Sequence, residues 1–65
     1  MQKQAKDLKN NDKIIIDGQP HIIKKIETSH LGKHGHAKCR IEAIGLKDKK
    51  ERIIIRLTED FIETL

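Results

Sequence analysis

Aromatic side chains are almost absent from this sequence. The 65 residues include one phenylalanine, Phe61, and no tryptophan or tyrosine, and isoleucine dominates an apolar fraction of 35%. β-Branched side chains pack better on a sheet than in a helical bundle. The chain is also near the lower size limit for building its own core, so it has little room for an enclosed cleft. We therefore expect one small β domain without catalytic activity.

Cysteine and long apolar runs are equally scarce. A single cysteine, Cys39, excludes an internal disulfide and any CxxC metal or redox pair, which fits a reducing compartment. The first residues, MQKQAKDLKNNDK, contain no apolar stretch typical of a signal peptide. No run approaches the length that spans a bilayer. These absences predict a cytoplasmic protein with no membrane partner.

Charge is the abundant property. Charged residues make up 37% of the chain, the net charge is +4 and the pI is about 9.4. A basic balance of this size favours nucleic acid over a membrane as the partner.

The amino-terminal half predicts an arm followed by a hairpin. Residues 1–12 are polar and end in the turn-prone NND, so we expect a flexible arm that touches the core through Leu8. The run KIIID is followed by DGQP, whose residues Asp17, Gly18 and Pro20 predict a tight turn. The next run, HIIKKIETS, predicts a second strand in which one face carries Ile22, Lys24, Ile26 and Thr28, and the other His21, Ile23, Lys25 and Glu27.

The carboxyl-terminal half contains the clearest strand. Residues 37–46 alternate strictly, with Ala37, Cys39, Ile41, Ala43 and Gly45 on one face. A charged connection, KDKKE, leads into RIIIRL, a strand that we expect to point Ile53, Ile55 and Leu57 inward. The tail TEDFIETL predicts a short strand or a single turn that closes the barrel, with Phe61, Ile62 and Leu65 as candidate core residues.

Short strands joined by tight turns predict an all-β fold, a small SH3-like barrel with a long exposed β-hairpin loop. The barrel is expected over residues 13–65, because closure removes the sheet edges that would otherwise aggregate. A monomer is expected.

The hairpin loop SHLGKHGHAK contains a lysine between two glycines. Gly32 and Gly35 remove bulk beside Lys33, and no acidic residue occurs from His30 to Ile41. A phosphate-binding P-loop is excluded, since that motif needs GxxxxGK followed by Ser or Thr and then a helix. An exposed lysine without a task remains the simplest alternative.

A zinc site is a second alternative for this loop. Its candidate ligands are His30, His34, His36 and Cys39. Three histidines on one loop are a weak pattern, so ordinary solvated histidines are favoured and no metal is expected.

The loop and its flanks resemble the translation initiation factor 5A family, the hypusine-containing factors. The resemblance is carried by GKHGHAK, by the upstream KDLKNNDKIIIDGQPHIIKKIETS and by the downstream AKCRIEAIGL, and it covers roughly residues 6–47. Three features depart from the family: Leu31 stands where archaeal members commonly have proline, KDKK replaces an aromatic after IGL, and the tail differs from the interdomain linker. The family's carboxyl-terminal OB-fold domain is also absent from this sequence.

The resemblance implies a chemistry for the loop. Lys33 would be modified to hypusine or deoxyhypusine, beginning with deoxyhypusine synthase, which transfers an aminobutyl group from spermidine and uses NAD. The protein itself would need no cofactor. The modified side chain would act at the P-site transfer RNA of the ribosome and promote peptide-bond formation. His34, His36, Lys38 and Arg40 would contact RNA.

A different class of function stays open. A single-domain SH3-like protein that binds RNA or the ribosome would keep the loop without modifying Lys33. For Lys38 and Arg40, a solvated strand face is an equally good interpretation.

Overall fold

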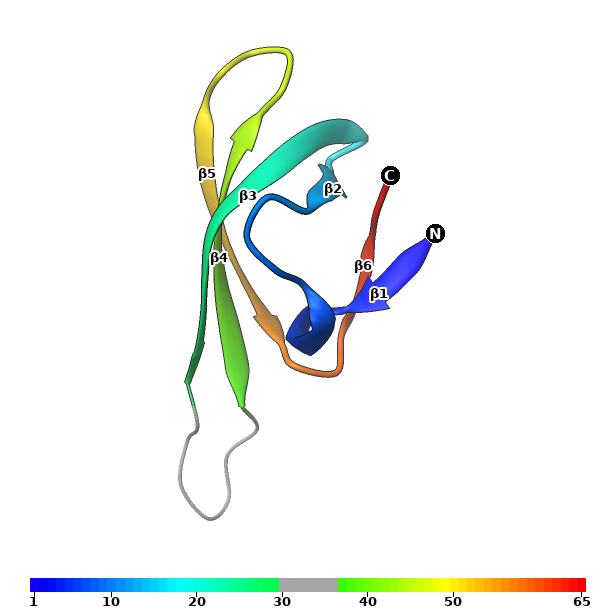
Figure 1. The fold of residues 1–65 in the computed structure, drawn as a ribbon, viewed down its shortest axis with the longest axis vertical. Coiled ribbons are helices and arrows are strands. Elements are labelled where there is room, and N and C mark those ends of the chain that lie inside the picture. Colours follow the sequence, from blue (N-terminus) through cyan, green and yellow to red (C-terminus); the bar gives the residue numbers. More distant parts are fainter. Residues whose placement is uncertain (30–36) are drawn as a thin grey trace.

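The computed structural model describes residues 1–29 and 37–65, which form six strands and one short 3-10 helix (Figure 1). The elements are β1 (Gln2–Gln4), η1 (Ala5–Asp7), β2 (Lys13–Ile16), β3 (Gln19–Ser29), β4 (Lys38–Gly45), β5 (Glu51–Leu57) and β6 (Phe61–Glu63). No helix among these residues is long and apolar enough to cross a membrane.

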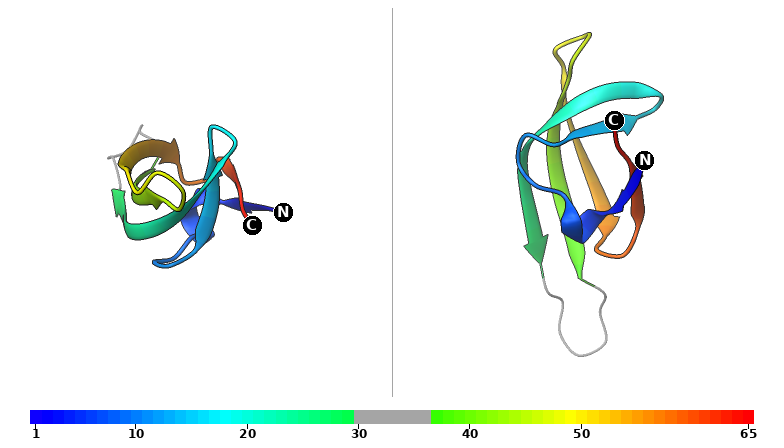
Figure 2. Two further views of the ribbon diagram at one scale, coloured as in Figure 1. Left: turned by 90° about the horizontal axis from the view of Figure 1, so that it is seen from above. Right: turned by 45° about the vertical axis from the view of Figure 1, so that its right-hand side comes forward.

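The strands form two antiparallel sheets that curl around one core. The larger sheet has the order β2-β3-β4-β5, and the smaller one pairs β1 with β6. A single bridge between Ile14 and Thr64 connects β2 to the smaller sheet. Two further views show the curled arrangement from above and after a partial turn about the vertical axis (Figure 2). The predicted all-β, SH3-like barrel is therefore confirmed.

The turn between β2 and β3 is the predicted tight hairpin. Its two central residues, Asp17 and Gly18, have φ angles of 51° and 75°. Positive φ at both positions is the geometry of a type I′ turn, whose twist matches that of the flanking strands. The register pairs Ile16 with Gln19 directly across this turn.

An extra residue interrupts the alternation of β3. Ile23 lies opposite Ala43 and Lys25 lies opposite Glu42, so Lys24 has no partner and forms a β-bulge. One extra residue reverses which side chains face inward. His21 and Ile23 therefore face the core before the bulge, while Ile26 packs against it afterwards. The prediction that alternate residues of β3 share one face therefore holds on each side of the bulge, but not across it.

The core is small and mostly aliphatic. The predicted inward face of β4 is confirmed, because its alternate residues from Cys39 to Gly45 are buried. The core cluster consists of Ala5, Leu8, Ile14, Ile16, Ile23, Cys39, Ile41, Ala43 and Ile62.

The predicted inward face of β5 is wrong. Ile53 and Ile55 are 53% and 51% exposed and Leu57 is exposed as well, whereas Ile54 packs against the core. The register explains this result, since Ile54 lies opposite the buried Ile41. The same register places Arg52 and Arg56 on the inward-facing side of the strand, where sequence patterning alone excluded them.

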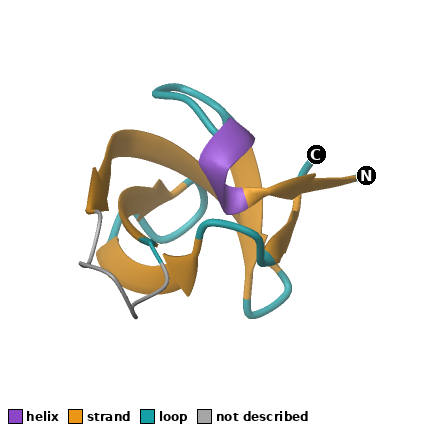
Figure 3. Ribbon diagram, turned by 90° about the horizontal axis from the view of Figure 1, so that it is seen from below, coloured by secondary structure: helices purple, strands orange, loops and turns teal. Residues whose placement is uncertain are grey.

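The predicted flexible arm over residues 1–12 is also corrected. β1 pairs with β6, and Ala5 in η1 is fully buried and donates its backbone N–H to the Asp60 carbonyl at 2.8 Å. The expected contact through Leu8 is confirmed by its burial. Seen from below, η1 lies over one end of the barrel (Figure 3). In the tail, Ile62 is buried as expected, but Phe61 and Leu65 are exposed.

A buried histidine joins β3 to the turn between β4 and β5. His21 is almost completely buried, and its Nδ1 lies 2.8 Å from the Gln19 carbonyl oxygen. Its Nε2 lies 2.8 Å from Nη1 of Arg52, whose Nη2 in turn donates to Asp48 Oδ2 at 2.8 Å. Arg52 donates, so Nε2 accepts and Nδ1 carries the proton that goes to Gln19. This chain of contacts explains why an arginine is tolerated on the inward-facing side of β5.

We predict that the Ala5→Asp variant is destabilised by at least about 3 kcal/mol, because it buries an unpaired carboxylate. Lys6→Asp introduces the same side chain at the exposed neighbouring position and should change stability by less than about 0.5 kcal/mol. Urea unfolding followed by circular dichroism measures both. Equal, small effects would show that the amino-terminal segment does not pack on the barrel.

We predict a pH-dependent stability contribution from Asp48. The hydrogen bond from Arg52, helped by the backbone N–H of Lys50, lowers the pKa of this carboxyl from 3.8 to about 2. A lowered pKa stabilises the fold fully above pH 4 and loses that effect as the pH falls through 2. Asp48→Asn should therefore lower the Tm at pH 7, and the difference from the original chain should shrink between pH 4 and pH 2. A constant difference would contradict this assignment.

Candidate functional site

The candidate site is the β3–β4 hairpin that carries the lysine loop. Gly32, Lys33, His34, Gly35 and His36 were singled out from the sequence, and they lie outside the described residues. His30, from the zinc alternative, also lies outside them. The structure therefore defines the site through the two strands on which this loop is mounted.

Those strands are paired without interruption up to the loop. From the bulge at Lys24 onward, the register continues to the last pair, Ser29 with Lys38. Ser29 Oγ donates to the Lys38 carbonyl at 3.5 Å. The carbonyl of Ala37, one residue before β4, accepts the N–H of Thr58 at 3.1 Å. The ends of the two strands are thus hydrogen-bonded to each other, and Ala37 is also bonded to the turn between β5 and β6.

The inner face of the hairpin belongs to the core. Cys39 has no exposed surface, and its Sγ lies 3.5 Å from Thr28 Oγ1 on the paired strand. Cys39 is thus held in the core, where its thiol contacts the paired strand. Among residues 1–29 and 37–65, no group of three or more potential metal ligands is found.

The outer face of the hairpin carries alternating charges in ion pairs. Lys25 Nζ lies 2.9 Å from Glu27 Oε1, and Arg40 Nη1 lies 3.0 Å from Glu42 Oε2. The hydrogen bond and charge of Lys25 lower the pKa of Glu27, and Glu27 in turn raises the pKa of Lys25. The acidic members, Glu27 and Glu42, were not singled out from the sequence. Their spacing of two residues from a basic side chain on the same strand face was the available signal.

The two basic residues assigned to RNA contact therefore differ. Arg40 is half-buried, lies opposite Ile55 and is engaged by Glu42. Lys38 is exposed at the start of β4, and no acidic side chain of the described chain lies within ion-pair distance of its amine. Of the two, Lys38 is thus the residue whose positive charge is more available to a ligand beside the loop.

Comparison with protein families gives one match that covers most of the chain. The family described as translation initiation factor 5A-like, N-terminal, matches residues 1–54. The chain belongs to this family. The resemblance noted in the sequence is thereby confirmed.

Individual relatives agree with the assignment. Translation initiation factor 5A from Thermococcus gammatolerans is 51% identical over 55 residues, and that from Methanosarcina acetivorans is 50% identical over 54 residues. These alignments cover 85% and 83% of this chain but only 40% and 42% of the relatives. The chain thus spans less than half the length of the curated relatives it matches.

Solved structures extend the similarity to the last strand. Eukaryotic translation initiation factor 5A from Methanococcus jannaschii superimposes with a TM-score of 0.88 at 34% identity, covering 98% of this chain and 48% of that one. A translation initiation factor eif-5a family protein from Naegleria fowleri gives a TM-score of 0.90 at 31% identity, covering 98% and 45%. Residues beyond the family match at Ile54 therefore still follow the same fold.

Proposed function

We propose that this protein is a factor 5A-like translation protein whose Lys33 is converted to hypusine or deoxyhypusine. The observation that carries the proposal is the glycine-bracketed lysine of GKHGHAK, joined to a hairpin that stays paired up to Ser29 and Lys38, in a member of this family. The modified side chain acts at the P-site transfer RNA and promotes peptide-bond formation.

The modification chemistry accounts for the composition of the loop. Deoxyhypusine synthase transfers an aminobutyl group from spermidine, with NAD, to the amine of Lys33. The amine attacks in its neutral form, and basic residues that follow it in the sequence, such as Lys38, would favour loss of its proton. Glycines at positions 32 and 35 have no side chains to obstruct entry into a narrow enzyme tunnel.

The paired strands supply the mechanical part of the function. A modified lysine has a long flexible side chain, so its reach is useful only if its base is held in place. β3 and β4 provide that base, and the hydrogen bond from Thr58 to Ala37 braces it from the side. Partners of this surface are the ribosome and its P-site transfer RNA, which implies a cytoplasmic location.

RNA contacts are assigned by charge. Lys38, whose ammonium group has no ion-pair partner among the described residues, pairs with RNA phosphates, whereas Arg40 contributes less because Glu42 neutralises it. His34 and His36 lie within the loop sequence and contact RNA or shape the loop. None of these contacts reads base sequence.

The modification is tested by intact mass measurement of the protein purified from its native host. We expect a mass increase equal to one aminobutyl group, with one further oxygen for hypusine, that maps to Lys33. Lys33→Arg should abolish both the mass increase and the stimulation of peptide-bond formation on ribosomes.

Two outcomes separate the alternatives. Unmodified protein that co-sediments with ribosomes would favour the single-domain RNA-binding function. A Lys33→Arg variant with full activity in peptide-bond formation would contradict the proposal.

The charge assignment gives a matched pair of variants. Lys38→Ala should weaken ribosome binding and lower the magnitude of the slope of log K against log salt by roughly one unit, since one phosphate contact is lost. Arg40→Ala removes the same formal charge but frees Glu42, so its salt slope should change less. Sedimentation of ribosome complexes at several salt concentrations measures both slopes, and an equal or reversed order would contradict the assignment.

A further inference from the structure

We propose that the outer edge of β5 pairs with β5 of a second copy of this chain, forming a weak, symmetric dimer. The proposal concerns a surface that the lysine loop does not use. β5 is one end of the four-stranded sheet, with the order β2-β3-β4-β5. An exposed edge strand offers a row of backbone groups to another strand unless it is covered, charged or interrupted.

The backbone groups on this edge can be assigned residue by residue. The N–H of Thr58 bonds to Ala37, and the carbonyl of Lys50 bonds to Gly45, so even-numbered residues of β5 face β4. Alternation in an antiparallel pair then directs the groups of Glu51, Ile53 and Ile55 to the open edge. Within the described chain, the only contact found for these groups is the Arg56 side chain on the Ile55 carbonyl, at 2.9 Å.

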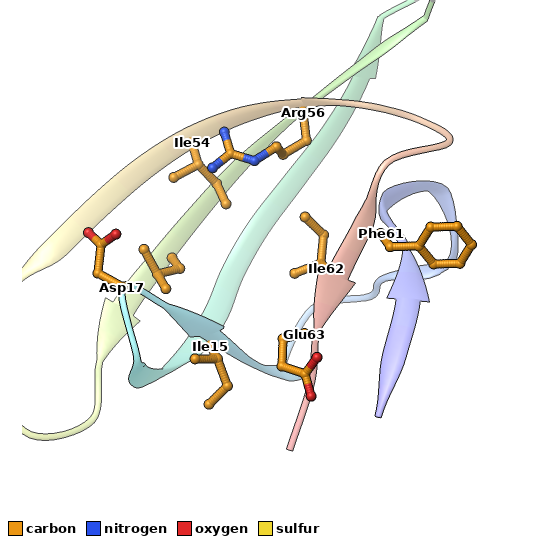
Figure 4. A pocket seen from close by; sticks show the side chains of 8 residues that line it. Ile15, Asp17, Ile54, Arg56, Phe61, Ile62 and Glu63 are labelled. Carbon is orange, nitrogen blue, oxygen red and sulfur yellow. The ribbon is translucent and has the colours of Figure 1, made fainter.

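The side chains beside this edge are apolar where a soluble monomer would place charge. Ile53 and Ile55 project from the outer face and are each about half exposed, and Leu57 follows them. On the other face, Ile54 borders a hollow of about 160 Å³ between β5, β2 and β6. In Figure 4, Arg56 and Ile54 lie along one side of this hollow, with Ile62 and Asp17 around it and Phe61 pointing away.

Hydrogen bonding limits the registers that the dimer can take. Leu57 cannot extend the ladder, because its N–H donates to Asp60 Oδ2 and its carbonyl accepts from the Asp60 N–H, both at 3.0 Å. Pairing Ile53 of one copy with Ile55 of the other joins the edge groups of these two residues twice, once on each side of the two-fold axis. This register also places isoleucine opposite isoleucine on the outer face.

Charge is compatible with the same register. It brings Arg56 of one copy opposite Arg52 of the other, which would be repulsive if both guanidinium groups were unpaired. Arg52, however, is bound by Asp48, and the negative charge of Asp17 also acts on it. Arg56 of one copy therefore approaches Arg52 of the other copy together with the carboxylates of Asp48 and Asp17, so repulsion between the two arginines is offset. A register with Ile53 opposite Ile53 would instead bring Lys50 opposite Arg56 without this compensation.

The contact is small, which sets the expected strength. One edge strand per copy buries much less than the area of a standard protein interface. The dimer should therefore form only at high protein concentration, and the expected monomer should prevail when the chain is dilute.

Analytical ultracentrifugation of the chain over a range of concentrations tests the dimer, with Ile53→Lys as the disrupting variant. The variant should raise the dimer dissociation constant by at least about tenfold, since it places a charge at the paired edge. Leu65→Lys is the matched control, because it removes an apolar side chain that is 68% exposed but lies away from β5. Circular dichroism confirms that both variants fold.

Amide hydrogen exchange by NMR tests the register in the same samples. The N–H groups of Ile53 and Ile55 should become protected as concentration rises, while that of Ile54, already bonded to β4, should be protected throughout. A dimer with a dissociation constant of about a millimolar would be populated at millimolar protein concentration. A chain that stays monomeric up to that concentration would overturn the proposal. A dimer without this protection, or one disrupted equally by Leu65→Lys, would overturn it as well.

Discussion

The antiparallel pairing of β3 with β4 is the interaction on which the rest of this structure depends. It joins the two longest strands, sets the inward face that carries Ile41 and Cys39, and ends at the pair that holds the lysine loop. The bulge at Lys24 makes this pairing possible for a curled sheet, because the added residue bends the strand and increases its twist. Without the bulge, either His21 and Ile23 or Ile26 would face solvent.

Charge on this small barrel is arranged in pairs more than in patches. The outer face of the hairpin alternates Lys25, Glu27, Arg40 and Glu42, and the inward-facing Arg52 is satisfied by His21 and Asp48. The net charge of +4 is therefore a poor guide to where nucleic acid binds. Lys38 is distinguished by its position at the loop and by the lack of an acidic partner among the described residues, and these two properties make it the better candidate for a phosphate contact.

Local sequence was sufficient wherever a pattern had one physical solution. The Asp17–Gly18 turn needs positive φ angles that few residue pairs accept, so its place was predictable. Strict alternation along β4 likewise allowed only one buried face. The run of three isoleucines in β5 had two solutions of similar quality, and the expectation that Ile53, Ile55 and Leu57 point inward selected the wrong one. The partners that make the other solution better, His21 and Asp48, are distant from one another in the sequence.

The sequence by itself determined the strand content, the hairpin that carries the lysine loop and the family to which the chain belongs, because turn residues, alternation and a spaced motif are local properties. Tertiary structure decided that residues 2–8 belong to the barrel, since a polar segment shows its use only when β6 pairs with β1 and Ala5 fills the core. It also decided which isoleucines of β5 are exposed. That choice depends on the register with β4, which brings Ile54 opposite Ile41 and leaves Ile53 and Ile55 at an open edge.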